Sequence, residues 1–228
     1  MPMEPRIADI VEAVKQILAT IPLGVTLVAA AKGRTVEEVE AALQAGVTHV
    51  GHNYIQEARP IIQALGGRAT WHMIGHLQRN KAKLAVRVFD MIETVDSLRL
   101  AQAIEHRCML LGVTMPVLVE INSGREPSKT GVSPEEVDDL VAAIADMEHV
   151  RVMGLMTMGP RFGDPEDARP YFRETRAAFE RLSSMSLANV TMRYLSMGMT
   201  NSYQVAIEEG ANIVRIGNKI FGQRQVDI

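Results

Sequence analysis

The sequence has little of what disulfide-bonded, nucleic-acid-binding or membrane-spanning proteins require. It contains one cysteine, Cys108, so no disulfide can form within the chain and a reducing compartment is expected. No apolar run reaches 18 residues, and the net charge of −3 comes without a long block of either sign. We therefore expect no membrane span and no nucleic-acid groove. The first 20 residues carry Glu4, Asp9 and Glu12 and lack the apolar block of a signal peptide, which predicts a cytoplasmic protein.

Several common catalytic motifs are missing as well. The chain has no P-loop, no Gly-x-Ser-x-Gly and no Cys-x-x-Cys sequence. Four histidines fall in or near expected strand ends: His49, His52, His72 and His76. His72 and His76 would share one face of a strand but lie far apart along it, with no carboxylate or cysteine close by. We expect no metal site.

What the sequence does have is apolar segments that alternate with helical patterns. Nearly half of its 228 residues are apolar, enough for one large core. Strands are expected at 25–31, 47–52, 69–75, 91–95, 115–121, 150–156, 190–195 and 213–216. Helices are expected at 5–20, 35–46, 54–65, 80–88, 97–107, 134–147, 165–183 and 201–209. Cys108 would follow the helix at 97–107 as a buried, inert thiol. Eight strand–helix units predict a single (β/α)8 barrel domain over residues 1–228, with an extra N-terminal helix; a doubly wound open sheet is the alternative.

A lysine ends the first of these strands. The uncharged run from Val25 to Ala31 is typical of a strand buried on both faces, and Lys32 follows it directly. An ammonium group at the end of such a strand is partly removed from water, which favours the uncharged amine that Schiff-base chemistry needs. The simpler interpretation is that Lys32 marks the point where the strand reaches solvent.

The seventh and eighth strands end in glycine-containing turns. In (β/α)8 barrels a phosphate often binds at the loops after these two strands. Here they read Leu195-Ser-Met-Gly-Met-Thr-Asn201 and Arg215-Ile-Gly-Asn218, with Thr200 or Asn201 expected to cap the next helix. Glycine lets backbone N–H groups approach an anion, and Ser196, Thr200 and Asn218 add side-chain donors. Ordinary turn and cap chemistry is the alternative. A lysine opposite such a phosphate anchor suits a phosphorylated aldehyde, either pyridoxal phosphate or a phosphorylated sugar, the latter implying an aldolase-type barrel.

Several segments resemble, in order, those of the pyridoxal phosphate (PLP) homeostasis protein family. They are Leu27-Val-Ala-Ala-Ala-Lys32, Gly51-His-Asn-Tyr-Ile-Gln-Glu57, Trp71-His-Met-Ile-Gly-His-Leu-Gln-Arg-Asn-Lys81, Val95-Asp-Ser97, Ser128-Lys-Thr-Gly131, Gly154-Leu-Met-Thr-Met-Gly159, Leu195-Ser-Met-Gly-Met-Thr200, Val214-Arg-Ile-Gly217 and Ile220-Phe-Gly222. The resemblance covers nearly the whole chain. It implies an alanine-racemase-like barrel without the racemase's second domain, monomeric or weakly associated.

The resemblance also implies residue roles. Lys32 would form the Schiff base with PLP, and Arg215 would face the pyridine nitrogen. Asn53 and His76 are lesser candidates for the pocket, and Lys129 raises the question of a second, looser aldehyde site. The phosphate would be held by residues of the two turns: Ser196, Met197, Gly198, Thr200, Gly217 and Asn218.

The chain departs from the family pattern at a few positions near these residues. Ala30-Ala31 replaces the usual Val-Ser before the lysine, and Gly33-Arg34 replaces Thr-Lys after it. His52 replaces a glutamate. Thr200 and Asn218 stand where Ser and Thr are more usual, and both keep a polar group.

Two functions fit these expectations. An arginine cannot share a proton with the pyridine ring as a carboxylate would, and racemisation needs a base on each face of the cofactor. Nothing in the sequence places Tyr54 or Tyr194 as the second base. The first hypothesis is therefore a non-catalytic PLP carrier, with PLP-dependent apoenzymes as partners. The second is an amino-acid racemase.

Overall fold

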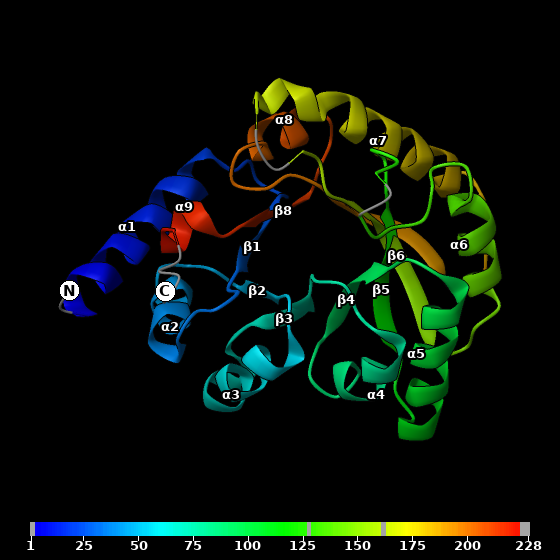
Figure 1. The fold of residues 1–228 in the computed structure, drawn as a ribbon, viewed down its shortest axis with the longest axis horizontal. Helices are drawn as coiled ribbons and strands as arrows, with labels where there is room; N and C mark the ends of the chain where they lie inside the picture. Colours follow the sequence, from blue (N-terminus) through cyan, green and yellow to red (C-terminus); the bar gives the residue numbers. More distant parts are fainter. Residues whose placement is uncertain (1–2, 127–128, 161–162, 224–228) are drawn as a thin grey trace.

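Eight parallel strands form a closed barrel in the computed structural model, which describes residues 3–126, 129–160 and 163–223. Each strand pairs with its neighbour in sequence, and β8 pairs with β1 to close the ring (Figure 1). The strands are β1 Thr26–Ala30, β2 His49–His52, β3 Thr70–Met73, β4 Met91–Val95, β5 Met115–Ile121, β6 Val150–Thr157, β7 Val190–Ser196 and β8 Ile213–Ile216. The predicted (β/α)8 barrel is confirmed, and the open sheet is excluded.

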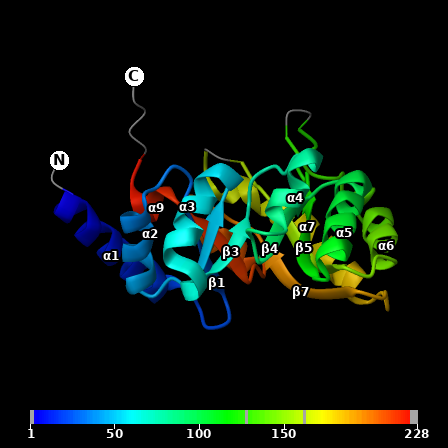
Figure 2. The ribbon, with the colours of Figure 1, turned by 90° about the horizontal axis from the view of Figure 1, so that it is seen from below.

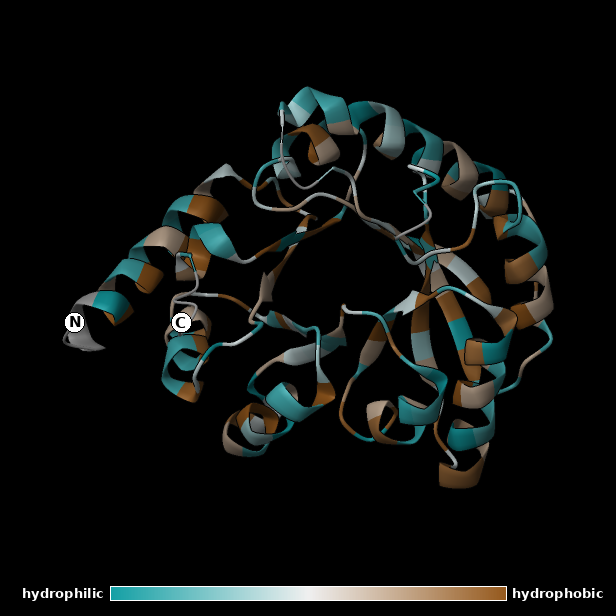
Figure 3. Cartoon of the chain, in the orientation of Figure 1, coloured by the Kyte–Doolittle hydropathy of each residue, from teal (hydrophilic) through white to brown (hydrophobic). Residues whose placement is uncertain are grey.

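Helices surround the barrel and follow the strands in order. They are α1 Met3–Thr20, α2 Val36–Gln44, α3 Ile55–Leu65, α4 Ala82–Ala85, α5 Leu98–Leu111, α6 Val137–Ala145, α7 Arg169–Ser183, α8 Tyr203–Glu208 and α9 Asn218–Phe221, with short 3-10 turns η1 Gly66–Arg68, η2 Arg79–Lys81 and η3 Pro165–Ala168. The strands are largely apolar and the outer surface of α7 largely polar in Figure 3. Among the described residues no helix is long and apolar enough to cross a bilayer.

The extra N-terminal helix is present, beside α2 and α9 (Figure 2). Its buried face carries Ile10, Val14 and Ile17 at helical spacing. Arg6 forms an ion pair with Glu38 of α2, with 2.7 Å between Nη2 and Oε1. Through α1 and α9, the two ends of the described chain pack together at one side of the barrel.

Capping and turn residues predict some helix ends correctly and others incorrectly. The capping box of Thr35 and Glu38 is formed as predicted at the start of α2. The helix expected to end at Arg107 runs one turn further, to Leu111, because Gly112 takes up the left-handed conformation (φ 64°) that stops it. Cys108 therefore lies inside α5; it is fully buried, as expected, and burial raises the pKa of its thiol to about 11.

The strands present alternate side chains to the barrel interior and to the helices. On β5, Val117 and Val119 pack against the helix layer, whereas Leu118 contacts Met91 and Met156 inside the barrel. Several inward positions carry polar side chains instead, and these cluster toward the carboxyl ends of the strands. That end of the barrel is where sites are found in this fold.

Candidate functional site

Lys32 lies at the carboxyl end of β1, half-buried. Its Nζ atom is 4.8 Å from the centroid of the Tyr54 ring, and no carboxylate pairs with it among the described residues. The turn that follows is fixed by Gly33, whose φ of 67° lies in the left-handed region and whose N–H donates to Glu57 Oε2 at 2.8 Å. The chain therefore presents an amine without an ion-pair partner on a well-anchored turn at the barrel mouth.

The two glycine turns after β7 and β8 lie side by side. The backbone N–H of Arg215 donates to the Gly198 carbonyl at 3.0 Å, which joins the two strand ends. Gly198 has a φ of 87°, and a Cβ there would lie 2.6 Å from that of Ala206, so the position requires glycine. A Cβ on Gly217 would lie 3.0 Å from the Ala30 carbonyl oxygen. The second turn thus packs closely against the end of β1.

This packing corrects the expected layout. We expected the phosphate turns opposite Lys32, but β8 pairs directly with β1, with Val28 beside Arg215 and Ala29 beside Ile216. The turns are therefore next to the lysine on the rim of the barrel. The predicted (β/α)8 barrel already implied this adjacency, because its eighth strand pairs with its first, and the expectation of an opposite anchor overlooked it.

The predicted turn residues differ in how their side chains are placed. Thr200 is half-buried and Asn218 exposed, so both can reach a ligand from solvent. Met197 packs into the hydrophobic core and its backbone N–H donates to the Ile213 carbonyl at 3.1 Å, so it offers no donor to a phosphate, contrary to the prediction. The residue at the N-cap position of α8 is Ser202 rather than the expected Thr200 or Asn201, and its side chain makes no capping hydrogen bond. Asn201 Nδ2 donates to the Gly163 carbonyl at 3.0 Å.

Arg215 and Ser196 belong to a buried polar network beneath these turns. The Arg215 guanidinium donates to the Ser196 hydroxyl through Nη1 and to the Thr157 carbonyl through Nη2 (2.8 Å). Ser196 Oγ donates in turn to Glu93 Oε2 at 2.6 Å, and Glu93 lies 3.7 Å from Arg215 Nη1. The Ser196 side chain is fully buried. In this arrangement it positions Arg215 and Glu93 below the site.

The network continues from Glu93 to two histidines. His72 Nδ1 lies 2.7 Å from Glu93 Oε1, and His72 Nε2 lies 2.9 Å from His49 Nδ1. Burial would raise the pKa of Glu93, but hydrogen bonding and charge from His72, with the charge of Arg215, hold it below its usual value. Burial lowers the pKa of His49 to about 4, so its ring is neutral. Glu93 is thus an ionised counter-charge for Arg215.

Sequence reasoning missed Glu93. A signal for it was present: it is the only charged residue in the otherwise uncharged strand Met91-Ile-Glu-Thr-Val95. A carboxylate within a buried strand needs a partner, and here it has three. His49 and His72 were considered only as metal ligands. Within the described ranges, no group of three histidine, cysteine or acidic side chains is arranged to hold a metal ion.

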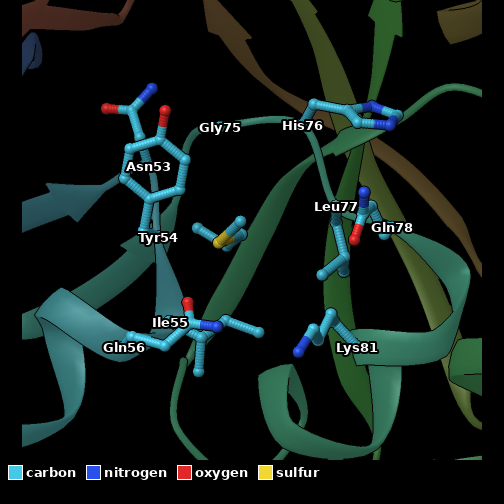
Figure 4. Close-up of a pocket in the computed structure, with 10 residues that line it drawn as sticks. Asn53, Tyr54, Ile55, Gln56, Gly75, His76, Leu77, Gln78 and Lys81 are labelled. Carbon is cyan, nitrogen blue, oxygen red and sulfur yellow. The ribbon is translucent and has the colours of Figure 1, made fainter.

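Asn53 and His76 both line a cavity of about 330 Å³ between the ends of β2 and β3 (Figure 4). Gly75 allows the loop after β3 to pass next to Asn53, whose carbonyl oxygen would be 2.5 Å from a Cβ at that position. The His76 ring points away from Asn53, and its Nδ1 lies 3.4 Å from Asp96 Oδ2. Tyr54 lies between this cavity and Lys32, because Tyr54 lines the cavity and its ring contacts Lys32 Nζ.

The other candidate positions near the mouth have structural partners. Arg34, where the family usually has lysine, donates from Nη2 to the Gly222 carbonyl at 2.6 Å and lies 5.4 Å from the Phe221 ring centroid. It ties the β1–α2 loop to the end of α9. Lys129 Nζ is bound by Glu126 Oε1 at 2.5 Å. Ser128 of the same predicted segment lies outside the described residues.

His52 faces the helix layer rather than the mouth. It is fully buried, its ring stacks on Trp71 with 6.1 Å between centroids, and neither ring nitrogen has a hydrogen-bond partner in the described part of the chain. Burial lowers its pKa from 6.5 to about 4. The histidine-for-glutamate departure therefore affects stability and leaves the mouth unchanged.

We expect this histidine to make the fold acid-sensitive. Below pH 6.5 the unfolded chain takes up a proton at His52 that the folded chain accepts only near pH 4, so stability falls as the pH drops through that window. The loss from this group reaches about 3 kcal/mol at pH 4. A His52→Leu variant should show a shallower decline in urea unfolding between pH 7 and 4, although His49 still contributes. An unchanged pH dependence in the variant would contradict the assignment.

Comparisons with known proteins show the family to which the chain belongs. The sequence profile of the family described as "Alanine racemase, N-terminal domain" matches residues 6–225, which defines the class of barrel. The chain is 38% identical to the pyridoxal phosphate homeostasis protein of Aquifex aeolicus over 200 residues, 87% of each chain. It is 35% identical to that of Escherichia coli K12 over 212 residues, covering 89% of this chain and 87% of the relative. The chain belongs to the pyridoxal phosphate homeostasis protein family.

Solved structures share the fold over nearly the whole chain. PipY of Synechococcus elongatus with PLP bound superposes with a TM-score of 0.85 at 28% identity, covering 93% of this chain and all of that one. Alanine racemase of Clostridium difficile superposes with a TM-score of 0.77 at 17% identity, but only 57% of the racemase chain is covered. The second likeness concerns the fold alone. The chain corresponds in extent to PipY rather than to the longer racemase.

Proposed function

We propose that this protein binds pyridoxal 5'-phosphate reversibly as a Schiff base on Lys32 and acts as an intracellular PLP carrier. The observation that carries the proposal is the placement of Lys32. Its half-buried amine has no carboxylate partner among the described residues, and it lies beside two glycine turns that carry the half-buried Thr200 and the exposed Asn218. The names of the relatives and the PLP bound to PipY support the choice of ligand.

The residues of the chain fit this cofactor. Lys32 supplies the amine that an aldehyde needs, and the turns around Gly198 and Gly217 supply backbone N–H groups for a phosphate, with Thr200 and Asn218 within reach from the rim. Arg215 is held charged by Glu93 and Ser196 and would face the pyridine nitrogen. When bound, PLP supplies an electron-withdrawing ring. An arginine beside the ring nitrogen does not protonate it, which weakens that effect.

The same contacts favour a carrier over a racemase. A racemase needs an acid–base group on each face of the cofactor. Tyr54 lies against Lys32 on the same side of the mouth, and Tyr194 packs against the Met91, Leu118 and Met156 cluster inside the barrel. Neither tyrosine is placed as a second base. Lys32 thus holds the cofactor without a partner for racemisation.

A transfer experiment separates the two functions. Purified protein is loaded with PLP, freed of excess cofactor, and mixed with the apo form of a PLP-dependent aminotransferase. We expect aminotransferase activity to appear while the visible absorbance of the loaded protein falls. In parallel, L-alanine is added to the loaded protein alone, and we expect no D-alanine.

Accumulation of D-alanine at an enzymatic rate would favour the racemase. Absence of transfer, with the cofactor still bound, would contradict the carrier role. Lys129→Ala serves as the matched control, because Lys129 is already paired with Glu126 and its removal should leave loading unchanged.

A further inference from the structure

A second buried glutamate points into the barrel, and its contacts leave one oxygen unused. Glu120 is 1% exposed and lies on the inward face of β5, two residues beyond Leu118, which contacts Met156 inside the barrel. Its neighbours Val119 and Ile121 pack against the helix layer. The Glu120 side chain therefore lies within the ring of strands, at their carboxyl ends.

One carboxyl oxygen of Glu120 is bound and the other is free. Thr130 Oγ1 donates to Oε1 at 2.8 Å, whereas Oε2 is buried without a hydrogen-bond partner in the described residues. Glu93 makes an informative comparison within the same barrel, because both of its oxygens are bound, one by His72 and one by Ser196. A glutamate with a purely structural role would be expected to look like Glu93.

The surroundings favour the protonated form of Glu120. Burial raises the pKa of its carboxyl, the Thr130 hydrogen bond opposes this, and the Asp96 carboxylate raises it further. The charges of Arg215 and His76 act in the opposite direction but do not reverse the shift. The neighbour across the strand pair, Met156, carries no charge. A protonated Glu120 has an O–H group on Oε2 that needs an acceptor, and the chain provides none in the described part.

We propose that Glu120 is a ligand-binding residue that donates a hydrogen bond from its carboxylic acid to the phenolic oxygen of the pyridoxal ring. The inference rests on the proposed function. The phosphate is assigned to the turns after β7 and β8, and β6 separates β5 from them, so the acceptor left for Glu120 is on the ring. A neutral carboxylic acid can hydrogen-bond an anionic oxygen, whereas an ionised one would repel it.

Pyridoxine 5'-phosphate is the probe for this contact. It carries the same phosphate and ring hydroxyl but no aldehyde, so its binding does not require a reaction with Lys32. Infrared difference spectra of the wild-type protein at pH 7 should show the carbonyl stretch of a protonated carboxylic acid that shifts when the probe binds. The band should be absent from Glu120→Gln and still present in Asp96→Asn, in which another carboxyl that acts on Glu120 is removed.

Affinity provides a second readout. Glu120→Gln keeps an N–H donor and should bind the probe within about threefold of the wild type, whereas Glu120→Leu has no donor and should bind about tenfold more weakly. Circular dichroism checks that each variant is folded. The infrared comparison of wild type with Glu120→Gln does not depend on the leucine variant.

The outcomes distinguish this inference from the proposed function. A bound probe with no shifting acid band, or a folded Glu120→Leu with unchanged affinity, overturns the role of Glu120 and leaves Lys32 unaffected. A shifting band without borohydride-stable attachment of PLP overturns the Schiff base and leaves Glu120 standing. A wild-type protein that does not bind pyridoxine 5'-phosphate at all overturns the role of Glu120, and borohydride trapping of PLP then decides the Schiff base separately.

Discussion

A Glu93→Ala variant is expected to lose about 3–5 kcal/mol of its free energy of unfolding, because it leaves the buried Arg215 guanidinium without a counter-charge. Glu93 is fully buried and receives hydrogen bonds from His72 and Ser196, and Arg215 is only 4% exposed. Removing the carboxylate therefore breaks three contacts at once. It also removes the ionised partner that keeps Arg215 oriented below the proposed cofactor site.

Urea unfolding at pH 7, followed by circular dichroism, measures this loss. The double variant Glu93→Ala/Arg215→Met should regain part of the stability, since it removes both charges together. Glu135→Ala, which breaks an exposed ion pair with Arg125, is the matched control and should have a much smaller effect. A loss of less than about 1 kcal/mol for Glu93→Ala would show that the network is not a coupled unit.

Lys32→Ala is expected to abolish covalent attachment of PLP and the visible absorbance that accompanies it. The amine is the only group at the end of β1 that can form an imine with the aldehyde, while the phosphate turns remain. Non-covalent retention should persist but weaken by at least about tenfold, measured by equilibrium dialysis. Lys81→Ala is a suitable control, because Lys81 lines the neighbouring cavity and its removal should leave the absorbance intact. Full absorbance in Lys32→Ala would exclude Lys32 as the attachment site.

Much of the fold could be predicted because its signals are local. The strands at Met91–Val95, Met115–Ile121 and Ile213–Ile216 have the bounds expected from their apolar runs. The capping box of Thr35 and Glu38 predicts the start of a helix from only four residues. Helices that begin or end in 3-10 turns were less well predicted, as at Asn80–Val88, where the structure has η2 followed by a short α4. The sequence preferences of a 3-10 turn and of an α-helical turn are too similar to distinguish the two there.

The candidate site was only partly predictable. Lys32 stands out because a charge follows seven uncharged residues, and the two turns stand out through Gly198 and Gly217. The residues that support this site do not stand out in the sequence. Ser196 and Glu93, for example, are 103 residues apart in the chain and meet across the barrel. No spacing rule reports such a contact. The position of Lys32 beside the second turn, by contrast, follows from the predicted barrel, in which strand eight pairs with strand one.

The different burial of two histidines was also not predictable from the sequence. His72 and His76 lie four residues apart in one predicted strand-end segment; both were considered as metal ligands, and His76 also as a lesser candidate for the cofactor pocket. In the structure His72 is buried in the network with Glu93, whereas His76 is half exposed beside Asp96. Their difference comes from the strand ending at Met73, which the alternation of apolar residues alone did not locate.

The most direct test of the account is to map where PLP attaches. Wild-type protein is incubated with PLP, reduced with borohydride, digested, and analysed by mass spectrometry. The account predicts a phosphopyridoxyl group on the peptide that contains Lys32, in near-stoichiometric yield. Attachment chiefly at another lysine, or no stable attachment, would contradict it.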